Sequence, residues 1–213
     1  MKSATGNDAL LIVLEGGEGA GKSTQSAYLA ARLRAAGRDV VETYEPGATK
    51  LGLRLREILL DPDSSIDPWA EALIYAADRA QHVAEVLAPA LDAGSDVISD
   101  RFVWSSLAYQ GAARGLGVDA IAAINKRVLD ALAEPVWVVI DIDPEIGLTR
   151  VGEGRDRIEA ESLQFHERVR EAFLDLAVRH EAIVVDANAD VETVAEAIWM
   201  GVVAEAGWRG VEL

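Results

Sequence analysis

A segment near the N-terminus carries the clearest chemical pattern in the sequence. Residues 16–23, GGEGAGKS, match G-x-x-x-x-G-K-[ST], in which glycines let successive backbone N–H groups point at phosphate oxygens. In such a loop Lys22 reaches the β and γ phosphates of a nucleotide, and the Ser23 hydroxyl binds Mg²⁺. We therefore predict nucleotide binding by this whole loop: Gly16, Gly17, Glu18, Gly19, Ala20, Gly21, Lys22, Ser23 and Thr24.

The carboxylate of Glu18 is unexpected in a loop that wraps a polyanion. Lys22 is the only basic residue of the loop, so further positive charge for a phosphate must come from elsewhere in the chain. Only four of the 20 basic residues are lysines, and the others are arginines, whose planar guanidinium binds phosphate through two hydrogen bonds. The arginines are therefore the candidates for that charge.

The segments around the loop predict an α/β fold. An apolar run at residues 9–15 precedes the loop, and a helical pattern begins at Lys22, so the order is strand, glycine loop, helix. Further apolar runs predict strands at residues 39–44, 95–100, 136–143 and 182–187. Helical patterns predict helices at residues 51–60, 68–94 (with a bend near Pro89), 118–132 and 161–180, and a last helix that closes the chain. This alternation predicts a five-stranded parallel sheet flanked by helices, with ligands at the carboxyl ends of the strands.

Length, charge and cysteine content limit the class of protein. The 213 residues suit one well-buried core, so we expect a single domain over residues 1–213, with residues 1–9 as a flexible N-terminus. The net charge of −16 opposes binding to nucleic acid or to anionic membranes. There is no cysteine, and the apolar run from Leu10 to Leu14 is too short for a signal peptide or a membrane span. We therefore expect a cytoplasmic protein.

The rest of the sequence indicates which class of nucleotide-binding protein this is. A GTPase needs a guanine-reading N-K-x-D, and the nearest match, NKRV at residues 125–128, has Val128 in place of the aspartate. Large motor and transport ATPases carry the loop in longer domains. A small kinase that transfers the γ-phosphoryl group is the leading class.

Four further segments, taken in order with the glycine loop, resemble thymidylate kinases of the bacterial type with basic residues in the lid. They are EPGATKLGLRLREILL, LIYAADRAQH, SDRFVWSSLAYQGAARGLG and GRDRIE. The resemblance implies the P-loop NTPase fold of nucleoside monophosphate kinases, and transfer of a phosphoryl group from ATP to dTMP with Mg²⁺, giving dTDP and ADP. It also implies a homodimer. Two alternatives remain open: a kinase for another deoxynucleotide or deoxynucleoside, and a noncatalytic ATP-binding module.

The resemblance assigns the base-binding residues of dTMP. Tyr75 and Arg79 are four residues apart and so share a helix face, and by resemblance the ring stacks on thymine while the arginine bonds its O4. Gln110 is implied to read thymine N3, and Tyr109 to crowd the sugar 2′ position. Ser105 and Ser106 repeat the same spacing and are the weaker candidates, since serines also bond the backbone at helix starts.

The resemblance also assigns the phosphate and sugar contacts. Asp100 is implied to hold Mg²⁺, while Arg101 and Arg56 grip the dTMP phosphate. Glu18 is implied to face the acceptor and to bond the deoxyribose 3′-OH, which accounts for its charge. Glu45 is implied to shape the acceptor pocket. The family commonly has an arginine directly before this glutamate, but here that position is Tyr44.

Residues 150–160 resemble a short, mobile lid. Arg150 is implied to lie against the adenine, and Arg155 and Arg157 are candidates for closing on the phosphates. We expect the catalytic residues to be Lys22, Arg101, Arg150 and Arg155, with Arg155 as a principal contact of the transferred phosphoryl group. No general base is expected, because the acceptor is already an ionised phosphate oxygen.

Overall fold

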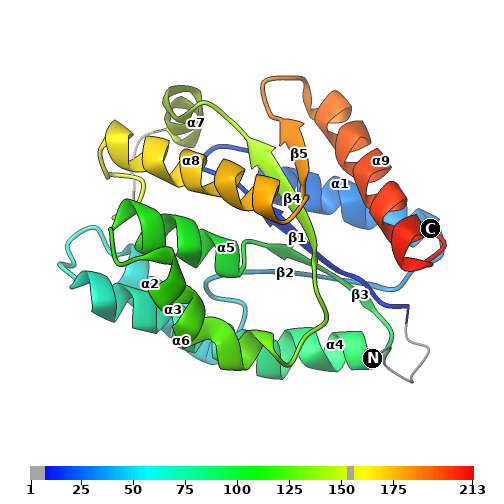
Figure 1. Cartoon of the computed structure of the whole chain (residues 1–213), viewed down its shortest axis with the longest axis horizontal. Coiled ribbons are helices and arrows are strands. Elements are labelled where there is room, and N and C mark those ends of the chain that lie inside the picture. Colours follow the sequence, from blue (N-terminus) through cyan, green and yellow to red (C-terminus); the bar gives the residue numbers. More distant parts are fainter. Residues whose placement is uncertain (1–7, 153–155) are drawn as a thin grey trace.

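The structure is a computed structural model that describes residues 8–152 and 156–213. Its centre is one parallel sheet of five strands in the order β2-β3-β1-β4-β5 (Figure 1). The strands are β1 (Leu11–Glu15), β2 (Val40–Tyr44), β3 (Asp96–Asp100), β4 (Val136–Asp141) and β5 (Ile183–Asp186). The predicted sheet is thus confirmed, with each strand within a few residues of its predicted bounds.

Helices connect the strands and cover both faces of the sheet. They are α1 (Lys22–Ala35), α2 (Lys50–Leu60), α3 (Pro68–His82), α4 (Ala88–Asp92), α5 (Val103–Ser106), α6 (Val118–Leu129), α7 (Pro144–Val151), α8 (Leu163–Arg179) and α9 (Val191–Arg209), with two π-helical segments, η1 (Val83–Leu87) and η2 (Leu107–Ala113). Successive side chains of β1 point to opposite faces, as in any strand. Ile12 and Leu14 join the core under α1 and α9, while Leu11 and Val13 join the core on the other face.

The predicted helix at residues 68–94 is three segments in the structure. It runs as α3, widens into the π-helical η1, and continues as the short α4, in which Pro89 occupies the first turn. Proline has no N–H and its ring clashes with the carbonyl four residues earlier, which disfavours regular α-helix at this point. Where the sequence predicts a bend, the structure thus has a π-helical turn just before Pro89.

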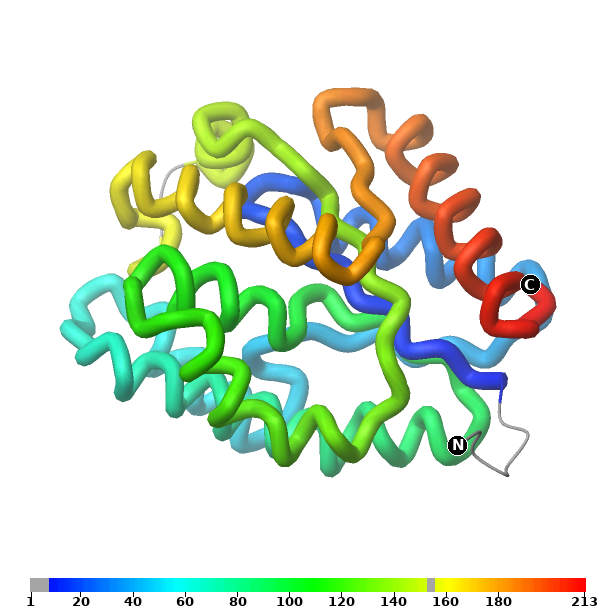
Figure 2. The backbone as a smooth tube through the Cα atoms, in the orientation of Figure 1, coloured from blue at the N-terminus to red at the C-terminus, as the bar shows by residue number. Residues whose placement is uncertain are grey.

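The carboxyl ends of the strands meet at one edge of the sheet, where the segments with predicted functions begin. The glycine loop follows β1, the turn that contains the cis Glu45–Pro46 peptide bond follows β2, and Arg101 follows β3. Figure 2 shows the segment that enters α8 (yellow) beside the turn that ends α2 (cyan), near this edge. Within the described residues, no helix is both long and apolar enough to span a membrane.

Candidate active site

The glycine loop lies between β1 and α1 and has the backbone of a phosphate cradle. Gly16, Gly19 and Gly21 have φ angles of 149°, 69° and 87°, a region that favours glycine. The buried Lys22 Nζ folds back and donates to the carbonyl oxygens of Gly16 at 3.1 Å and Gly17 at 2.8 Å. Burial and the charge of Arg101 lower the pKa of Lys22, although nearby carboxylates oppose the shift. The lysine is therefore held at the loop and charge-balanced there.

The loop is also packed against α7 by two glycines. A Cβ on Gly19 would lie 2.1 Å from the carbonyl oxygen of Gly147, and a Cβ on Gly147 would lie 2.2 Å from the carbonyl oxygen of Glu18. No side chain fits at either position without moving the backbone. Sequence reasoning missed Gly147, because a single glycine in a helical pattern carries no sign of what approaches it.

Asp100 and Ser23 form the candidate magnesium site. The Ser23 hydroxyl donates to Asp100 Oδ2 at 2.6 Å. A hydroxyl and a carboxylate are hard oxygen ligands of the kind that Mg²⁺ prefers. Among the described residues, no group of three or more histidine, cysteine, aspartate or glutamate side chains is arranged to hold a metal ion. The donor set thus suits Mg²⁺ that is shared with nucleotide phosphates, and does not suit an all-protein metal cage.

Arg101 connects the glycine loop to the acceptor side. Its backbone has a φ of 71°, which is uncommon for a residue other than glycine and occurs preferentially where the surrounding structure imposes it. Its guanidinium bonds Glu18 Oε1 at 2.8 Å, the carbonyl oxygen of Gly16 at 3.1 Å and the Tyr109 hydroxyl at 3.3 Å. The sharp turn after β3 thus directs this cation back over the loop.

Glu18 is the counter-ion of Arg101. Tyr109 also donates to its Oε1, at 2.7 Å. Burial raises the pKa of Glu18, but Arg101 and Lys22 outweigh that effect and lower it to about 2. Glu18 is therefore ionised at neutral pH, and its charge is balanced by the two cations that phosphate would also contact.

A second carboxylate, Glu15, was not predicted from the sequence. It ends β1, is fully buried, and accepts from the backbone N–H groups of Phe102 at 2.9 Å and Ser105 at 3.1 Å. The Ser105 hydroxyl donates to its other oxygen at 2.6 Å. Burial raises the pKa of Glu15 to about 7, against these hydrogen bonds and the charge of Arg101. Ser105 is thus occupied in joining β1 to the start of α5.

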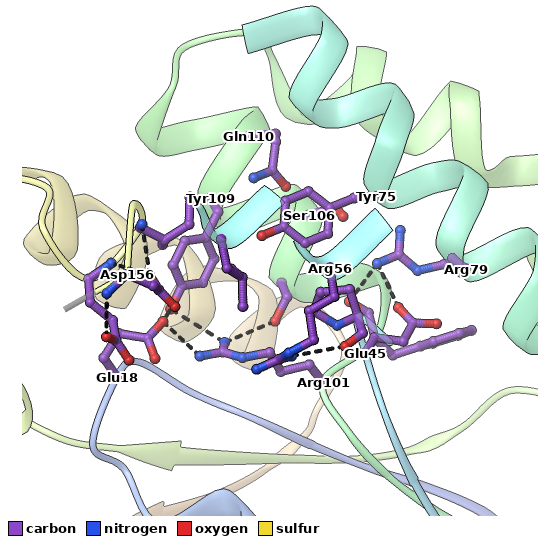
Figure 3. A pocket seen from close by; sticks show the side chains of 16 residues that line it. Glu18, Glu45, Arg56, Tyr75, Arg79, Arg101, Ser106, Tyr109, Gln110 and Asp156 are labelled. Carbon is purple, nitrogen blue, oxygen red and sulfur yellow. Dashed lines mark hydrogen bonds and ion pairs between the residues drawn. The ribbon is translucent and has the colours of Figure 1, made fainter. Parts of the chain in front are cut away.

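The predicted acceptor residues surround one pocket (Figure 3). All ten line it: Glu18, Glu45, Arg56, Tyr75, Arg79, Arg101, Ser105, Ser106, Tyr109 and Gln110. The buried Ser106 hydroxyl has no hydrogen-bond partner among the residues that the structure describes, so it is free to bond a ligand. The other six lining residues were not predicted as site residues: Pro46, Leu60, Phe102, Asp156, Ile158 and Glu159.

Arg79 is held at the pocket by a buried network that the sequence did not reveal. It donates to Asn125 Oδ1 at 2.7 Å and to the Phe102 carbonyl oxygen at 3.1 Å, and it forms an ion pair with Glu45 Oε2 at 2.8 Å. The other oxygen of Glu45 lies 2.9 Å from His82 Nδ1. The Glu45 carboxylate is therefore turned toward Arg79 and His82. Asn125 and His82 lie on helix faces with no motif to mark them.

Arg56 and Tyr44 lie together where the acceptor pocket meets the glycine loop. Arg56 donates to the Pro46 carbonyl oxygen at 2.9 Å, and its guanidinium carbon lies 5.9 Å from the centre of the Tyr44 ring. Tyr44 stands where the family commonly has an arginine, and here its ring packs against the Arg56 guanidinium in a weakly attractive cation–π contact.

Two further hollows lie along the glycine loop, and only the first adjoins the acceptor pocket. The first lies over the glycine loop and shares five residues with it: Glu18, Glu45, Arg56, Arg101 and Glu159. The second is lined by residues of the loop, by Arg150 and by residues 187–194. Arg150 bonds the carbonyl oxygens of Gly19 at 3.4 Å and Ala187 at 3.2 Å. The segment after β5 was not predicted to contribute to a site.

The second described part of the predicted lid, residues 156–160, lies against the acceptor side, unlike Arg150. Arg157 bonds Glu71 Oε2 at 2.6 Å and the Leu59 carbonyl oxygen at 2.9 Å, so its guanidinium is held away from the glycine loop. It is not among the residues that line either the acceptor pocket or the hollow over the loop. Arg155 falls outside the described residues.

The strand order, the glycine loop after β1 and the adjoining acceptor pocket define a P-loop phosphotransferase of the nucleoside monophosphate kinase type. The sequence pattern of the thymidylate kinase family matches residues 14–198. The chain belongs to the thymidylate kinase family, which consists of phosphotransferases that use ATP as the phosphoryl donor.

Individual relatives agree with this assignment. The chain is 48% identical to a thymidylate kinase of Deinococcus radiodurans, over 92% of this chain and 97% of that one. It is 45% identical to a thymidylate kinase of Halothermothrix orenii, over 89% of this chain and 94% of that one. A crystal structure of thymidylate kinase from Ehrlichia chaffeensis superposes with a TM-score of 0.74 and 29% identity, and the match covers 91% of this chain and 98% of that one.

Proposed function

We propose that this enzyme transfers the γ-phosphoryl group of ATP to dTMP, giving dTDP and ADP, and that it does so in dTTP synthesis. The observation that carries the proposal is the junction between the acceptor pocket and the hollow over the glycine loop. Arg56 and Arg101 line both of them. An acceptor whose phosphate is bound by these arginines lies next to the loop that binds the donor phosphates. Such placement of two reactants is a large part of catalysis in phosphoryl transfer.

The acceptor pocket suits a deoxynucleoside monophosphate. We assign Tyr75 to stacking on the thymine ring, Arg79 to its O4 and Gln110 to its N3. Glu18 bonds the deoxyribose 3′-OH, and Tyr109 restricts the space beside the sugar. Glu45 and Ser105 act on the acceptor through other residues, since Glu45 pairs with Arg79 and Ser105 bonds Glu15.

The donor ATP is proposed to lie along the glycine loop. Its adenine fits the hollow beside Arg150 and residues 187–194, and its phosphates fit the N–H groups of the loop. Ser23 and Asp100 would hold Mg²⁺, which, when bound, neutralises charge on the donor phosphates.

Catalysis then rests on positioning and on charge. The acceptor oxygen is ionised already, so no side chain has to remove a proton. Lys22 and Arg101 stabilise the negative charge on the transferred phosphoryl group, and Glu18 keeps Arg101 directed at the junction. Arg150 fixes the donor from the side of the adenine.

We also propose a homodimer in the cytoplasm, where ATP is available. Exposed apolar side chains support the dimer: Leu51 and Ile58 are seven residues apart on α2, and Trp69 and Leu73 are four apart on α3. These spacings put each pair on one helix face. Large exposed apolar side chains on packed helices are typical of a subunit interface.

An acceptor panel tests the activity. ADP release is measured with ATP, Mg²⁺ and each of dTMP, dUMP, dCMP, dGMP and thymidine. We expect the highest kcat/KM with dTMP, and no turnover for Lys22→Met although it folds. Preference for any other acceptor would identify a different deoxynucleotide or deoxynucleoside kinase. Binding of ATP without ADP release would indicate a noncatalytic module.

A further inference from the structure

A cluster of four charged side chains lies directly behind the acceptor pocket. Its centre is Glu71 of α3, whose side chain is 1% exposed. Glu71 Oε2 lies 2.6 Å from Arg157 NH1 and 3.3 Å from Arg114 NH2, and Arg114 also pairs with Glu161 at 2.5 Å. Two carboxylates and two guanidinium groups balance, so the cluster, which is buried at Glu71 and partly exposed at Glu161, carries no net charge.

Glu71 also binds Gln110, the amide of the acceptor pocket. Gln110 Nε2 donates to Glu71 Oε1 at 2.7 Å. A carboxylate has only acceptor atoms, so a side-chain amide that bonds it must present its NH₂ group and turn its carbonyl oxygen elsewhere. In Figure 3 the oxygen of Gln110 is on the side of Tyr75 and Ser106, inside the pocket. The orientation of the Gln110 amide is therefore set by Glu71.

We infer that Glu71 is a specificity-determining positioning residue, which selects the base of the acceptor by fixing the direction of the Gln110 amide. It does not touch the substrate. With Glu71 in place, the pocket offers the carbonyl oxygen of Gln110 as an acceptor and the Arg79 guanidinium as a donor. The inference rests on the proposed function, because it concerns the base of the same acceptor.

This pattern matches one type of pyrimidine edge. Thymine and uracil have an N–H at position 3 beside a carbonyl at position 4, so the first donates to Gln110 and the second accepts from Arg79. Cytosine reverses both groups: its N3 is an acceptor and its C4 carries an amino donor. A site built to bond one pattern leaves buried groups unpaired with the other, which costs roughly a hundredfold or more in kcat/KM.

The same carboxylate has a second, purely structural role from which the first can be separated. Through Arg157 it fixes the segment that contributes Asp156 and Ile158 to the pocket wall, and Arg157 in turn bonds the Leu59 carbonyl oxygen. Loss of this anchor should weaken every acceptor alike. Loss of the amide orientation should change the ranking of acceptors.

The test is a comparison of dTMP with 5-methyl-dCMP, which differ only at the N3 and C4 edge of the base. In Glu71→Gln the new amide supplies both a donor and an acceptor, so Gln110 is free to turn. We expect the kcat/KM ratio of dTMP to 5-methyl-dCMP to fall at least tenfold, while the ratio of dTMP to dUMP, which share that edge, stays within twofold. Arg157→Gln is the matched control and should keep both ratios.

A double variant identifies the route of the effect. In a Gln110→Ala background the substitution Glu71→Gln should leave the ratio unchanged, because the amide that it reorients is absent. If Glu71→Gln does not fold, Glu71→Gln/Arg157→Gln keeps the cluster neutral and carries the same expectation, with Arg157→Gln as its reference.

Two negative results have different meanings. An unchanged ratio of dTMP to 5-methyl-dCMP in folded Glu71→Gln, with both acceptors weakened equally, would overturn the inference and leave a structural role. A wild-type enzyme that does not phosphorylate dTMP would instead overturn the proposed function.

Discussion

At the scale of single residues, the site is organised by a carboxylate that pairs with a cation proposed to bind phosphate. Glu18 lies in the glycine loop and is held by Arg101 and Tyr109. Because its pKa is lowered to about 2, the ion pair persists across the whole neutral range. The stability that it contributes is present above the ordinary pKa of a glutamate and is lost only as the pH falls toward 2. The negative charge of the loop is thus a fixed part of the site.

The first prediction concerns this carboxylate. Glu18→Gln removes the charge that bonds the proposed 3′-OH and that orients Arg101. Hydrogen bonds to charged groups contribute about 1.5–3 kcal/mol, so the KM for dTMP should rise about tenfold or more, while the KM for ATP changes little. Steady-state rates with each substrate varied in turn measure this. Glu196→Gln, in an exposed pair with Arg32, is the control. An unchanged KM for dTMP would leave Glu18 as a structural counter-ion of Arg101 with no role in acceptor binding.

At the scale of elements, buried polar contacts join the ends of strands to the helices that follow. Glu15 ends β1 and accepts from the first N–H groups around α5, which a helix start leaves without partners. One carboxylate thus fixes the direction of α5 and η2, the segments that carry Ser106, Tyr109 and Gln110.

The second prediction follows from the pKa of Glu15, which burial raises to about 7 from an ordinary value of 4.5. The folded protein then binds a proton that the unfolded chain has lost, so this contribution to stability is present at low pH and is lost as the pH rises through 7. In Glu15→Gln that dependence disappears. Between pH 4.5 and 7.5 the free energy of unfolding should therefore fall by about 3 kcal/mol more in the wild type than in Glu15→Gln.

Urea unfolding at a series of pH values measures the second prediction. Other groups also make the free energy of unfolding depend on pH, such as Asp78, whose pKa burial raises to about 6. Both proteins contain these groups, so their contribution cancels when the profile of Glu15→Gln is subtracted from that of the wild type. Parallel profiles for wild type and Glu15→Gln would contradict a protonated Glu15 in the folded state.

The third prediction concerns the packing of α7 on the glycine loop. Gly147→Ala places a methyl group 2.2 Å from the Glu18 carbonyl oxygen, so the loop must move. Overpacking costs about 1–3 kcal/mol, and the displaced loop should lower kcat/KM for ATP at least tenfold and reduce the melting temperature.

The matched control for the third prediction is Gly207→Ala on α9, whose added methyl group meets no atom within 4 Å. It should keep full activity and gain about 0.5–1 kcal/mol of stability, because alanine favours helix over glycine. If the two alanine variants had the same kcat/KM for ATP and the same melting temperature, the contact between α7 and the loop would contribute neither to activity nor to stability.

The elements also show what the sequence could and could not predict. The strands and the loop after β1 were predictable, because apolar runs and glycine spacing are local signals. All ten predicted acceptor residues line one pocket, since a family motif carries their places with it. Glu15, Glu71 and His82 were not predicted, because each acts through a partner that is distant in sequence. The position of Arg157 was also missed, since spacing alone does not say which way a loop arginine turns.

At the scale of the whole molecule, three adjoining hollows follow one edge of the sheet, from residues 187–194 past the glycine loop to the acceptor pocket. The acceptor end of this row is built largely on α2, α3 and η2. The apolar side chains that we propose as the dimer interface lie on two of these helices. Association of two subunits would therefore stabilise α2 and α3, the helices that carry Arg56, Tyr75 and Arg79.

The fourth prediction tests that arrangement. The protomer mass is 22.8 kDa, so light scattering after size exclusion should give about twice this value at micromolar concentration. In Leu51→Glu/Leu73→Glu two charges replace apolar side chains at the proposed interface, and charges at the centre of an interface without partners oppose association. We expect a folded monomer with a raised KM for dTMP. Val178→Glu, on α8 and 81% exposed, should stay dimeric and active. A monomeric wild type, or a dimer that both variants retain, would place any interface elsewhere.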